Sequence, residues 1–179
     1  MAGPVTIGVF LIHRDHVGSI NFADDSKKLS EKKREEMFKE LNLLKKQGIC
    51  NFVTVSKNAL QINKKGISFC IKDSIRIGLS KIVEDPTHVH VKLDGLLSAP
   101  EEYIFQETIT KGDSKEKVIG AASIVAKVTR DRYMNREAKK YPEYGFENHK
   151  GYGTRVHVEA IKKHGIINHH RNLWVRNIT

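Results

Sequence analysis

The sequence predicts an α/β protein in which one mixed β-sheet is flanked by helices. Short runs rich in β-branched and apolar residues alternate with longer segments whose apolar residues recur every three or four positions. Of the 179 residues, 39% are hydrophobic, which is normal for a globular domain with its own core. No internal repeat or low-complexity segment interrupts this order. We therefore predict a single domain over residues 1–179, of which residues from about 154 to 179 form a C-terminal helix and a basic tail.

Four segments in the first half of the chain alternate between strand and helix. Residues 5–13 (VTIGVFLIH) and residues 49–56 (ICNFVTVS) are β-branched and apolar, which predicts buried strands. Between them, Ser30 is a suitable N-cap for a helix over residues 31–46. Isoleucine and leucine at helical spacing predict a second amphipathic helix over residues 66–83.

The second half predicts two more strands and two more helices. Residues 88–93 (HVHVKL) and 103–110 (YIFQETIT) have strand patterns, and each run leads into an acidic turn. A long helix is predicted from about residue 115 to residue 140, and its early part, residues 121–126 (AASIVA), is rich in small residues that would pack closely on a sheet. A last helix is predicted over residues 155–164, between a capping threonine and a glycine.

The positive charge of the chain is concentrated in its C-terminal third. Lys and Arg number 31 against 21 Asp and Glu, which gives a net charge of +10. Residues 111–179 contain 15 Lys and Arg but only 7 Asp and Glu, so this region supplies 8 of the 10 excess charges. A one-sided basic surface is typical of nucleic-acid binding, because cations displace the counterions of a polyanion. The alternative is a solvated basic face that favours solubility, and His169-His170-Arg171 is interpreted as part of a basic tail.

Several protein classes are disfavoured by composition and by missing motifs. No apolar run approaches the ~20 residues of a membrane helix, and the first residues lack the pattern of a signal peptide. Two cysteines are too few for a disulfide framework or a zinc cluster. The sequence also lacks the glycine-rich phosphate loops and the nucleophile elbow of common enzyme motifs. We expect a cytoplasmic protein without a membrane partner.

Two aspartates stand at equivalent places after neighbouring strands. Asp94 follows residues 88–93, and Asp113 follows residues 103–110. Strands that are neighbours in sequence are usually neighbours in space, so the two carboxylates are expected at one edge of the sheet. Carboxylate oxygens are the ligands that Mg²⁺ and Mn²⁺ prefer. The alternative reading is structural, since Asp-Gly is a common turn pair and Asp113 is a suitable helix N-cap.

The segment from His149 to Thr154 (HKGYGT) combines a cation, an aromatic ring and flexible backbone. A ring such as that of Tyr152 can stack on a base or a ribose while a cation such as Lys150 contacts a phosphate. The alternative is a folded loop in which the tyrosine fills a gap in the core.

Six strings taken together resemble bacterial ribonuclease HII in their order and spacing. They are AGPV from Ala2, DDSKKLSEKKREEMF from Asp24, LDG from Leu93, KGDSK from Lys111, AASIVAKVTRDRYM from Ala121 and YPEYGFENHKGYGT from Tyr141. The resemblance implies a ribonuclease H-like fold and an Mg²⁺- or Mn²⁺-dependent endonuclease. We expect the full-length protein to be a monomer. Such enzymes cleave the RNA strand of RNA–DNA hybrids and nick duplex DNA at embedded ribonucleotides, leaving a 5′-phosphate.

The resemblance also assigns roles to individual residues. Two of the four acids of the family site map to Asp94 and Asp113, which would be catalytic metal ligands. Tyr152 maps to the tyrosine that stacks on the sugar at the RNA–DNA junction and helps to recognise the 2′-hydroxyl. Lys150 lies in the same string and is assigned to substrate binding.

One family motif is absent from the sequence. The first strand of the family carries Gly-x-Asp-Glu-x-Gly-Arg-Gly shortly before the AGPV string, whereas here Met1 directly precedes Ala2 and the sequence contains no Asp-Glu pair. We therefore expect the sheet to lack its first, central strand. One explanation is that the sequence is an incomplete version of a longer, active gene product, which we favour because every later motif is intact. The alternative is an inactive homologue that only binds nucleic acid or needs another chain to complete its sheet.

Overall fold

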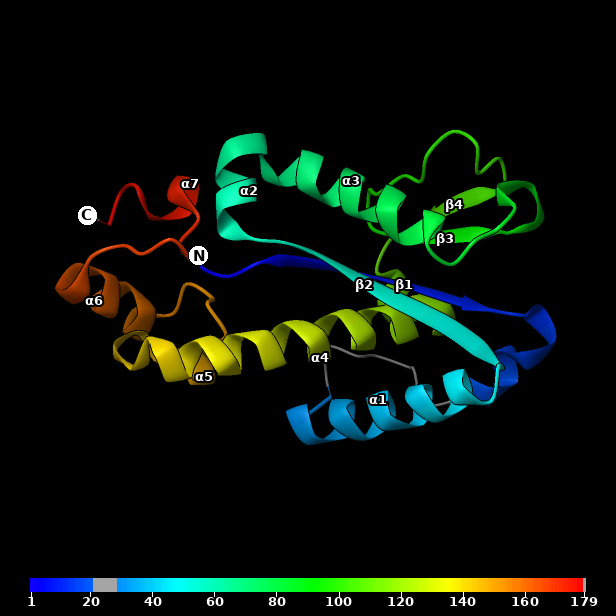
Figure 1. Ribbon diagram of the computed structural model, residues 1–179, viewed down its shortest axis with the longest axis horizontal. Helices are drawn as coiled ribbons and strands as arrows, with labels where there is room; N and C mark the ends of the chain where they lie inside the picture. The colour runs from blue at the N-terminus through cyan, green and yellow to red at the C-terminus, as the bar shows by residue number, and fades with distance from the viewer. Residues whose placement is uncertain (21–28, 179) are drawn as a thin grey trace. The chain divides into compact units, whose positions relative to one another are not determined.

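The computed structural model describes residues 1–20 and 29–178 (Figure 1). They form two compact units. Unit 1 comprises Met1–Thr6, Ser56–Ile71 and Thr129–Thr179, and unit 2 comprises Ile7–Val55 and Lys72–Val128. Residues 24–28 of the string that begins at Asp24 lie outside the described residues.

Helices and strands alternate along the chain, which confirms the predicted α/β class. The strands are β1 (Val5–Ile12), β2 (Cys50–Lys57), β3 (Val91–Asp94) and β4 (Gln106–Ile109). The α-helices are α1 (Glu31–Lys46), α2 (Ala59–Lys65), α3 (Ile67–Ser80), α4 (Lys117–Lys140), α5 (Phe146–His149), α6 (Arg155–His164) and α7 (Asn172–Val175). Short 3-10 helices cover Arg14–Ile20, Pro86–His88, Gly112–Ser114 and Pro142–Tyr144. In the described part of the chain, no helix has the length and apolar character needed to cross a bilayer.

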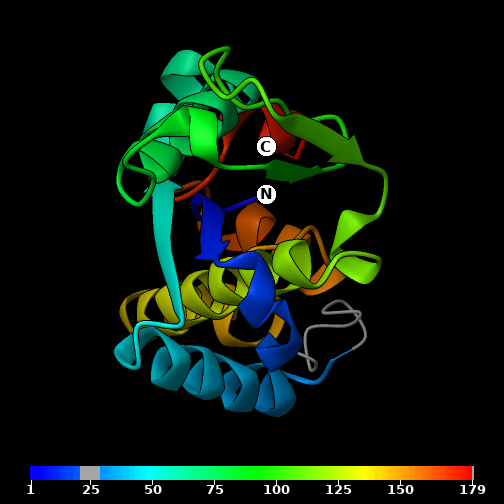
Figure 2. The same cartoon turned by 90° about the vertical axis from the view of Figure 1, so that its right-hand side faces the viewer.

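The described strands form two separate pairs. One two-stranded sheet joins β1 to β2, and another joins β3 to β4. In the second pair the strands are parallel, with Val91 opposite Gln106 and Asp94 opposite Ile109 (Figure 2). Each described strand therefore has one strand neighbour, and the single mixed sheet expected from the sequence is seen as two pairs.

The core of unit 2 forms where α1 packs on β2 and on the first half of α4. The Ser30 hydroxyl accepts a hydrogen bond from the Lys33 N–H at 3.2 Å, so the predicted cap is present. Met37 and Leu41, four residues apart on α1, are buried in this core. Its other buried members are Ile20, Cys50, Phe52, Ala121, Ile124, Val125 and Val128. The bounds of α1 agree with the predicted helix 31–46.

Strand β1 and helix α4 approach so closely that a side chain at Gly8 has no space. A Cβ atom built on Gly8 would lie 2.2 Å from the carbonyl oxygen of Ala122. This contact confirms that the small residues at the start of α4 permit close packing on a strand.

We predict that Gly8→Ala lowers the free energy of unfolding by about 2–3 kcal/mol, because the backbone of α4 has to shift to admit one methyl group. Gly18→Ala is the matched control, since a Cβ atom there meets nothing within 4 Å, and it should change stability by less than about 0.5 kcal/mol. Urea denaturation of the three proteins measures both values, and equal stability of the two variants would contradict the packing argument.

One short helix was not predicted. The helix predicted over residues 66–83 corresponds to α3, and α2 lies before it, with Gly66, which has a φ of +81°, as its C-cap. Asn58 and Gln61 form a capping box at the start of α2, in which each side chain accepts a hydrogen bond from the other residue's backbone N–H at 2.9 Å. Helix α2 was missed because this start signal is local and the apolar periodicity of the segment is weak.

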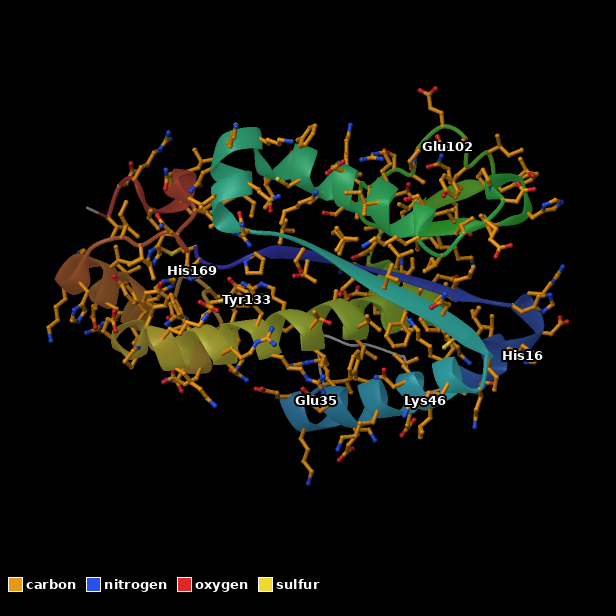
Figure 3. The ribbon with its side chains drawn as sticks, viewed as in Figure 1. His16, Glu35, Lys46, Glu102, Tyr133 and His169 are labelled. Atoms are coloured by element: carbon orange, nitrogen blue, oxygen red, sulfur yellow. The ribbon has the colours of Figure 1, made fainter. Side chains whose placement is uncertain are left out.

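The C-terminal segment contributes to the core of unit 1. The bounds of α6 agree with the predicted helix 155–164, and the tail contains the unpredicted helix α7. The buried core residues of this unit are Ala2, Met134, Ala138, Tyr144, Phe146, Ile161 and Val175. His169 lies beside Tyr133 (Figure 3), and its Nε2 is 2.9 Å from the buried carboxylate of Glu137. His170 is 1% exposed, so the predicted basic tail is in part buried.

Candidate active site

Asp94 lies at the end of β3 against the turn that carries Asp113. The Gly112 N–H donates a hydrogen bond to Oδ1 of Asp94 at 2.8 Å. A further hydrogen bond of 3.1 Å, from the Gly95 N–H to the Ile109 carbonyl oxygen, joins the ends of β3 and β4. Asp113, one residue after Gly112, is only 3% exposed. The structure thus brings Asp94 next to the 3-10 helix Gly112–Ser114, at one end of the parallel pair.

The Gly112 position leaves little room beside Asp94. A Cβ atom at Gly112 would lie 2.5 Å from Cδ1 of Ile119 and 3.5 Å from Oδ1 of Asp94. Lys111, just before it, adopts the left-handed conformation with a φ of +56°, which is uncommon for a residue with a side chain. Close packing and this turn conformation together fix the Gly112 N–H on the Asp94 carboxylate.

Other acids near this turn are paired with a cation. Lys92 on β3 contacts Glu116 at 2.8 Å and Glu107 at 3.4 Å. The hydrogen bond to Glu116 raises the pKa of Lys92, and this effect outweighs the opposing effect of partial burial. Lys92 therefore stays protonated at neutral pH and compensates the charges of these two glutamates.

The donors at this turn fit a hard divalent cation. Mg²⁺ usually keeps several waters and is bound through one or two carboxylates together with substrate phosphates. The Gly112 N–H orients the Asp94 carboxylate, and the buried Asp113 follows in the same turn. Within residues 1–20 and 29–178, no three or more His, Cys, Asp or Glu side chains are grouped as metal ligands. Asp94 and Asp113 thus have the ligand chemistry, carboxylate oxygens, that such an ion prefers.

Tyr152 occupies an exposed loop of unit 1 between α5 and α6. Its side chain is 54% exposed, and the guanidinium carbon of Arg130 lies 5.0 Å from the ring centroid. A cation held against one face of an aromatic ring stabilises the position of the ring. The ring that the sequence singled out is therefore available for stacking and does not fill a gap in the core.

Lys150 contributes to the structure of the loop. It has a φ of +49° and is 9% exposed. Its ammonium group donates hydrogen bonds to Oδ1 of Asn135 at 2.7 Å and to the carbonyl oxygen of Glu147 at 2.6 Å. These contacts favour a role in ordering the loop that carries Tyr152, and a direct contact of Lys150 with substrate stays a prediction.

Two arginines that sequence reasoning did not single out lie beside the loop. Arg130 Nε donates to the Pro4 carbonyl oxygen at 3.1 Å, and Arg171 donates to the carbonyl oxygens of Gly3 at 3.0 Å and Pro4 at 2.8 Å. Burial, together with the positive charge of Arg130, lowers the pKa of Arg171, although a guanidinium remains charged at neutral pH. Their partners come from the start of the chain, so spacing along the sequence gave no signal for this cluster.

The fold is that of the ribonuclease H-like nucleases. The structure is similar to ribonuclease HII of Archaeoglobus fulgidus in its complex with PCNA, with a TM-score of 0.78 and 22% identity, covering 99% of this chain and 90% of that one. It is also similar to a Bst ribonuclease HIII in complex with Mn²⁺, with a TM-score of 0.68 and 15% identity, covering 92% of this chain and 58% of that one.

Sequence comparison identifies the family within this class. The family model described as Ribonuclease HII matches residues 1–177. Ribonuclease HII of Aliarcobacter butzleri is 40% identical over 174 residues, which are 97% of this chain and 84% of that protein. Ribonuclease HII of Clostridioides difficile is 38% identical over 178 residues, which are 99% of this chain and 66% of that protein. The chain belongs to the ribonuclease HII family.

Proposed function

We propose that this protein is a metal-dependent endoribonuclease that cleaves the RNA strand of RNA–DNA hybrids and nicks duplex DNA at embedded ribonucleotides. Membership of the ribonuclease HII family makes it a nuclease, which is a hydrolase of phosphodiester bonds. The proposal rests chiefly on one observation. The Asp94 carboxylate accepts a hydrogen bond from the Gly112 N–H, which lies in the turn that contains Asp113. We further propose that it acts as a monomer in the cytoplasm.

Asp94 and Asp113 would hold Mg²⁺ or Mn²⁺ in this protein. A divalent ion bound there would stabilise negative charge on the reacting phosphodiester and lower the pKa of a bound water. The chain's own contribution is to fix the carboxylates: the Gly112 N–H orients Asp94, and the burial of Asp113 limits its motion. The similarity in fold to a ribonuclease HIII that binds Mn²⁺ supports the choice of ion.

Tyr152 would stack against the sugar at the RNA–DNA junction. The 2′-hydroxyl is the group that distinguishes RNA from DNA at a single position, so selection of one ribonucleotide needs a side chain at that sugar. The exposed ring of Tyr152, backed by Arg130, offers such a contact. The Lys and Arg residues of the C-terminal third would bind phosphates and set the register without reading bases.

A nicking assay on a duplex with one ribonucleotide tests this function. We expect the protein, with Mn²⁺, to cut one strand at the ribonucleotide and to leave a 5′-phosphate, and to leave the all-DNA duplex of the same sequence intact. Cleavage of both duplexes at equal rates would contradict selection of ribose.

The alternative function is binding of nucleic acid without cleavage. It is favoured by one observation: residues 111–179 supply 8 of the 10 excess positive charges, which suits binding of a polyanion whether or not it is cleaved. This alternative predicts salt-sensitive binding of hybrid duplex with no product at any Mn²⁺ concentration. Product formation by the purified protein decides against it.

A further inference from the structure

Three buried histidines surround the loop that carries Tyr152. His149 ends α5, His157 lies in the first half of α6, and His170 precedes α7, and their exposed fractions are 8%, 0% and 1%. The rings of His149 and His157 stack with centroids 4.5 Å apart and an interplanar angle of 13°. Buried polar rings need partners for both nitrogens, so their hydrogen bonds reveal how they are used.

His170 and His157 form a chain of hydrogen bonds in which each ring accepts at one nitrogen and donates from the other. The Ile167 N–H donates to Nδ1 of His170 at 2.9 Å, so this nitrogen is an acceptor and the proton of the neutral ring is on Nε2. Nε2 of His170 lies 3.2 Å from Nε2 of His157, which must therefore accept. Nδ1 of His157 is then protonated and donates to the Tyr152 carbonyl oxygen at 2.8 Å. A single assignment of tautomers satisfies all three contacts.

His149 holds the same loop from its other side. Its Nδ1 accepts a hydrogen bond from the Gly151 N–H at 3.2 Å, and its Nε2 donates to the Tyr144 carbonyl oxygen at 2.8 Å. Gly151 has a φ of +81°, and a Cβ atom there would lie 2.5 Å from the Ala2 carbonyl oxygen. The backbone on both sides of the Gly151–Tyr152 peptide is thus bound by imidazole rings.

The chain of hydrogen bonds requires neutral rings. Burial lowers the pKa of His157 to about 4 and that of His170 to about 4, so both are neutral at pH 7. Protonation of His157 would place two donors against each other at the contact between the Nε2 atoms, and protonation of His170 would place a second donor against the Ile167 N–H. Other titratable groups that face the pair are His149, His169, the Tyr144 hydroxyl and the amino group of Met1, whose pKa burial lowers to about 5.

We propose that His157 and His170 are positioning residues for substrate recognition: their directed hydrogen bonds end on the Tyr152 carbonyl oxygen and fix the backbone from which the Tyr152 ring contacts ribose. The proposal rests on the proposed role of Tyr152. It assigns to His157 an effect on selection of ribose that is exerted through Tyr152 and requires no contact of the histidine with substrate.

The first test reads the tautomers directly. Long-range ¹H–¹⁵N correlation spectra of the full chain at pH 7 should show neutral His157 with its proton on Nδ1 and neutral His170 with its proton on Nε2. This measurement needs no variant. A proton on Nε2 of His157, or a charged ring at either position, would overturn the proposal.

The second test is a double-mutant cycle on binding. Fluorescence anisotropy in EDTA, at fixed salt, measures affinity for a duplex with one ribonucleotide relative to the all-DNA duplex. We expect His157→Leu to reduce this ratio by about 5- to 10-fold, and to reduce it no further in a Tyr152→Ala background, because coupled residues are not additive. His157→Asn, whose amide can still donate to Tyr152, should recover the ratio to within about 2-fold of wild type.

The control is His164→Gln, because His164 is an exposed histidine on the same helix. This substitution should leave unchanged the ratio of the affinities for the two duplexes. Additive effects of His157→Leu and Tyr152→Ala would show that His157 acts only on general stability and would overturn the inference, while the role of Tyr152 would stand. No effect of Tyr152→Ala itself would instead contradict the proposed function, and the inference would fall with it.

Discussion

Replacing Asp94 by asparagine should reduce Mn²⁺-dependent nicking by at least about 100-fold, because a direct metal ligand loses its charge. The substitution is nearly isosteric. The asparagine oxygen can still accept the hydrogen bond from the Gly112 N–H, so the turn that carries Asp113 should keep its structure. We expect the free energy of unfolding to change by less than about 1 kcal/mol. The measurements are kcat/KM on a duplex with one ribonucleotide and urea denaturation of the same preparation.

Asp15→Asn is the control for loss of one negative charge. Asp15 lies in the 3-10 helix Arg14–Ile20, and its side chain is 76% exposed. Its replacement should change activity by less than about 2-fold, since surface substitutions away from a site have small effects. Full activity of Asp94→Asn, or equal losses in the two variants, would contradict the assignment of Asp94 to the metal site.

Removing the aromatic ring of Tyr152 should have the second largest effect. Stacking of a base or sugar on an aromatic side chain is worth ~1–3 kcal/mol, so Tyr152→Ala should lower kcat/KM on the single-ribonucleotide duplex by about 10-fold or more. Because the side chain is 54% exposed, the stability of the protein should change little. Steady-state nicking of this duplex, together with thermal denaturation, separates the two effects.

Tyr152→Phe separates the contribution of the ring to kcat/KM from that of the hydroxyl. If stacking carries the effect, the phenylalanine variant keeps most of the activity, and if the hydroxyl recognises the 2′-hydroxyl, it loses as much as the alanine variant. Wild-type activity of Tyr152→Ala would remove Tyr152 from the proposed site.

The elements with strong local signals were predicted well from the sequence. Helices α1 and α6 agree with the predicted ranges because Ser30 and Thr154 cap them, and each side chain accepts the hydrogen bond expected of an N-cap. Strand β2 was predicted one residue too early, which is within the usual uncertainty of element ends. The helix predicted over residues 66–83 corresponds to α3, whereas the short helix α2 before it was missed because its start signal is local.

The site was predicted in part. The positions of Asp94 and Asp113 after neighbouring strands predicted their approach, which the hydrogen bond from Gly112 supports, whereas their role as metal ligands stays a proposal. Lys150 was assigned to substrate from its place beside Tyr152, but its ammonium group is bound by Asn135 and Glu147. A contact to a residue fifteen positions earlier cannot be predicted from the spacing of a loop motif.

The cluster of buried histidines could not be predicted from the sequence. His149, His157 and His170 have none of the close spacings of a metal motif, and the last of them was interpreted as part of a basic tail. Only the packing of α5, α6 and the segment before α7 brings the rings together. Burial then lowers the pKa of His157 and that of His170, and the neutral rings determine the direction of the hydrogen bonds between them.

The central claim is that Asp94 and Asp113 hold a divalent ion, and anomalous diffraction from crystals soaked in Mn²⁺ tests it most directly. We expect an anomalous peak within coordination distance of carboxylate oxygens of both residues, and its loss in crystals of Asp94→Asn. A peak bound elsewhere in the molecule, with both of these carboxylates unliganded, would contradict it.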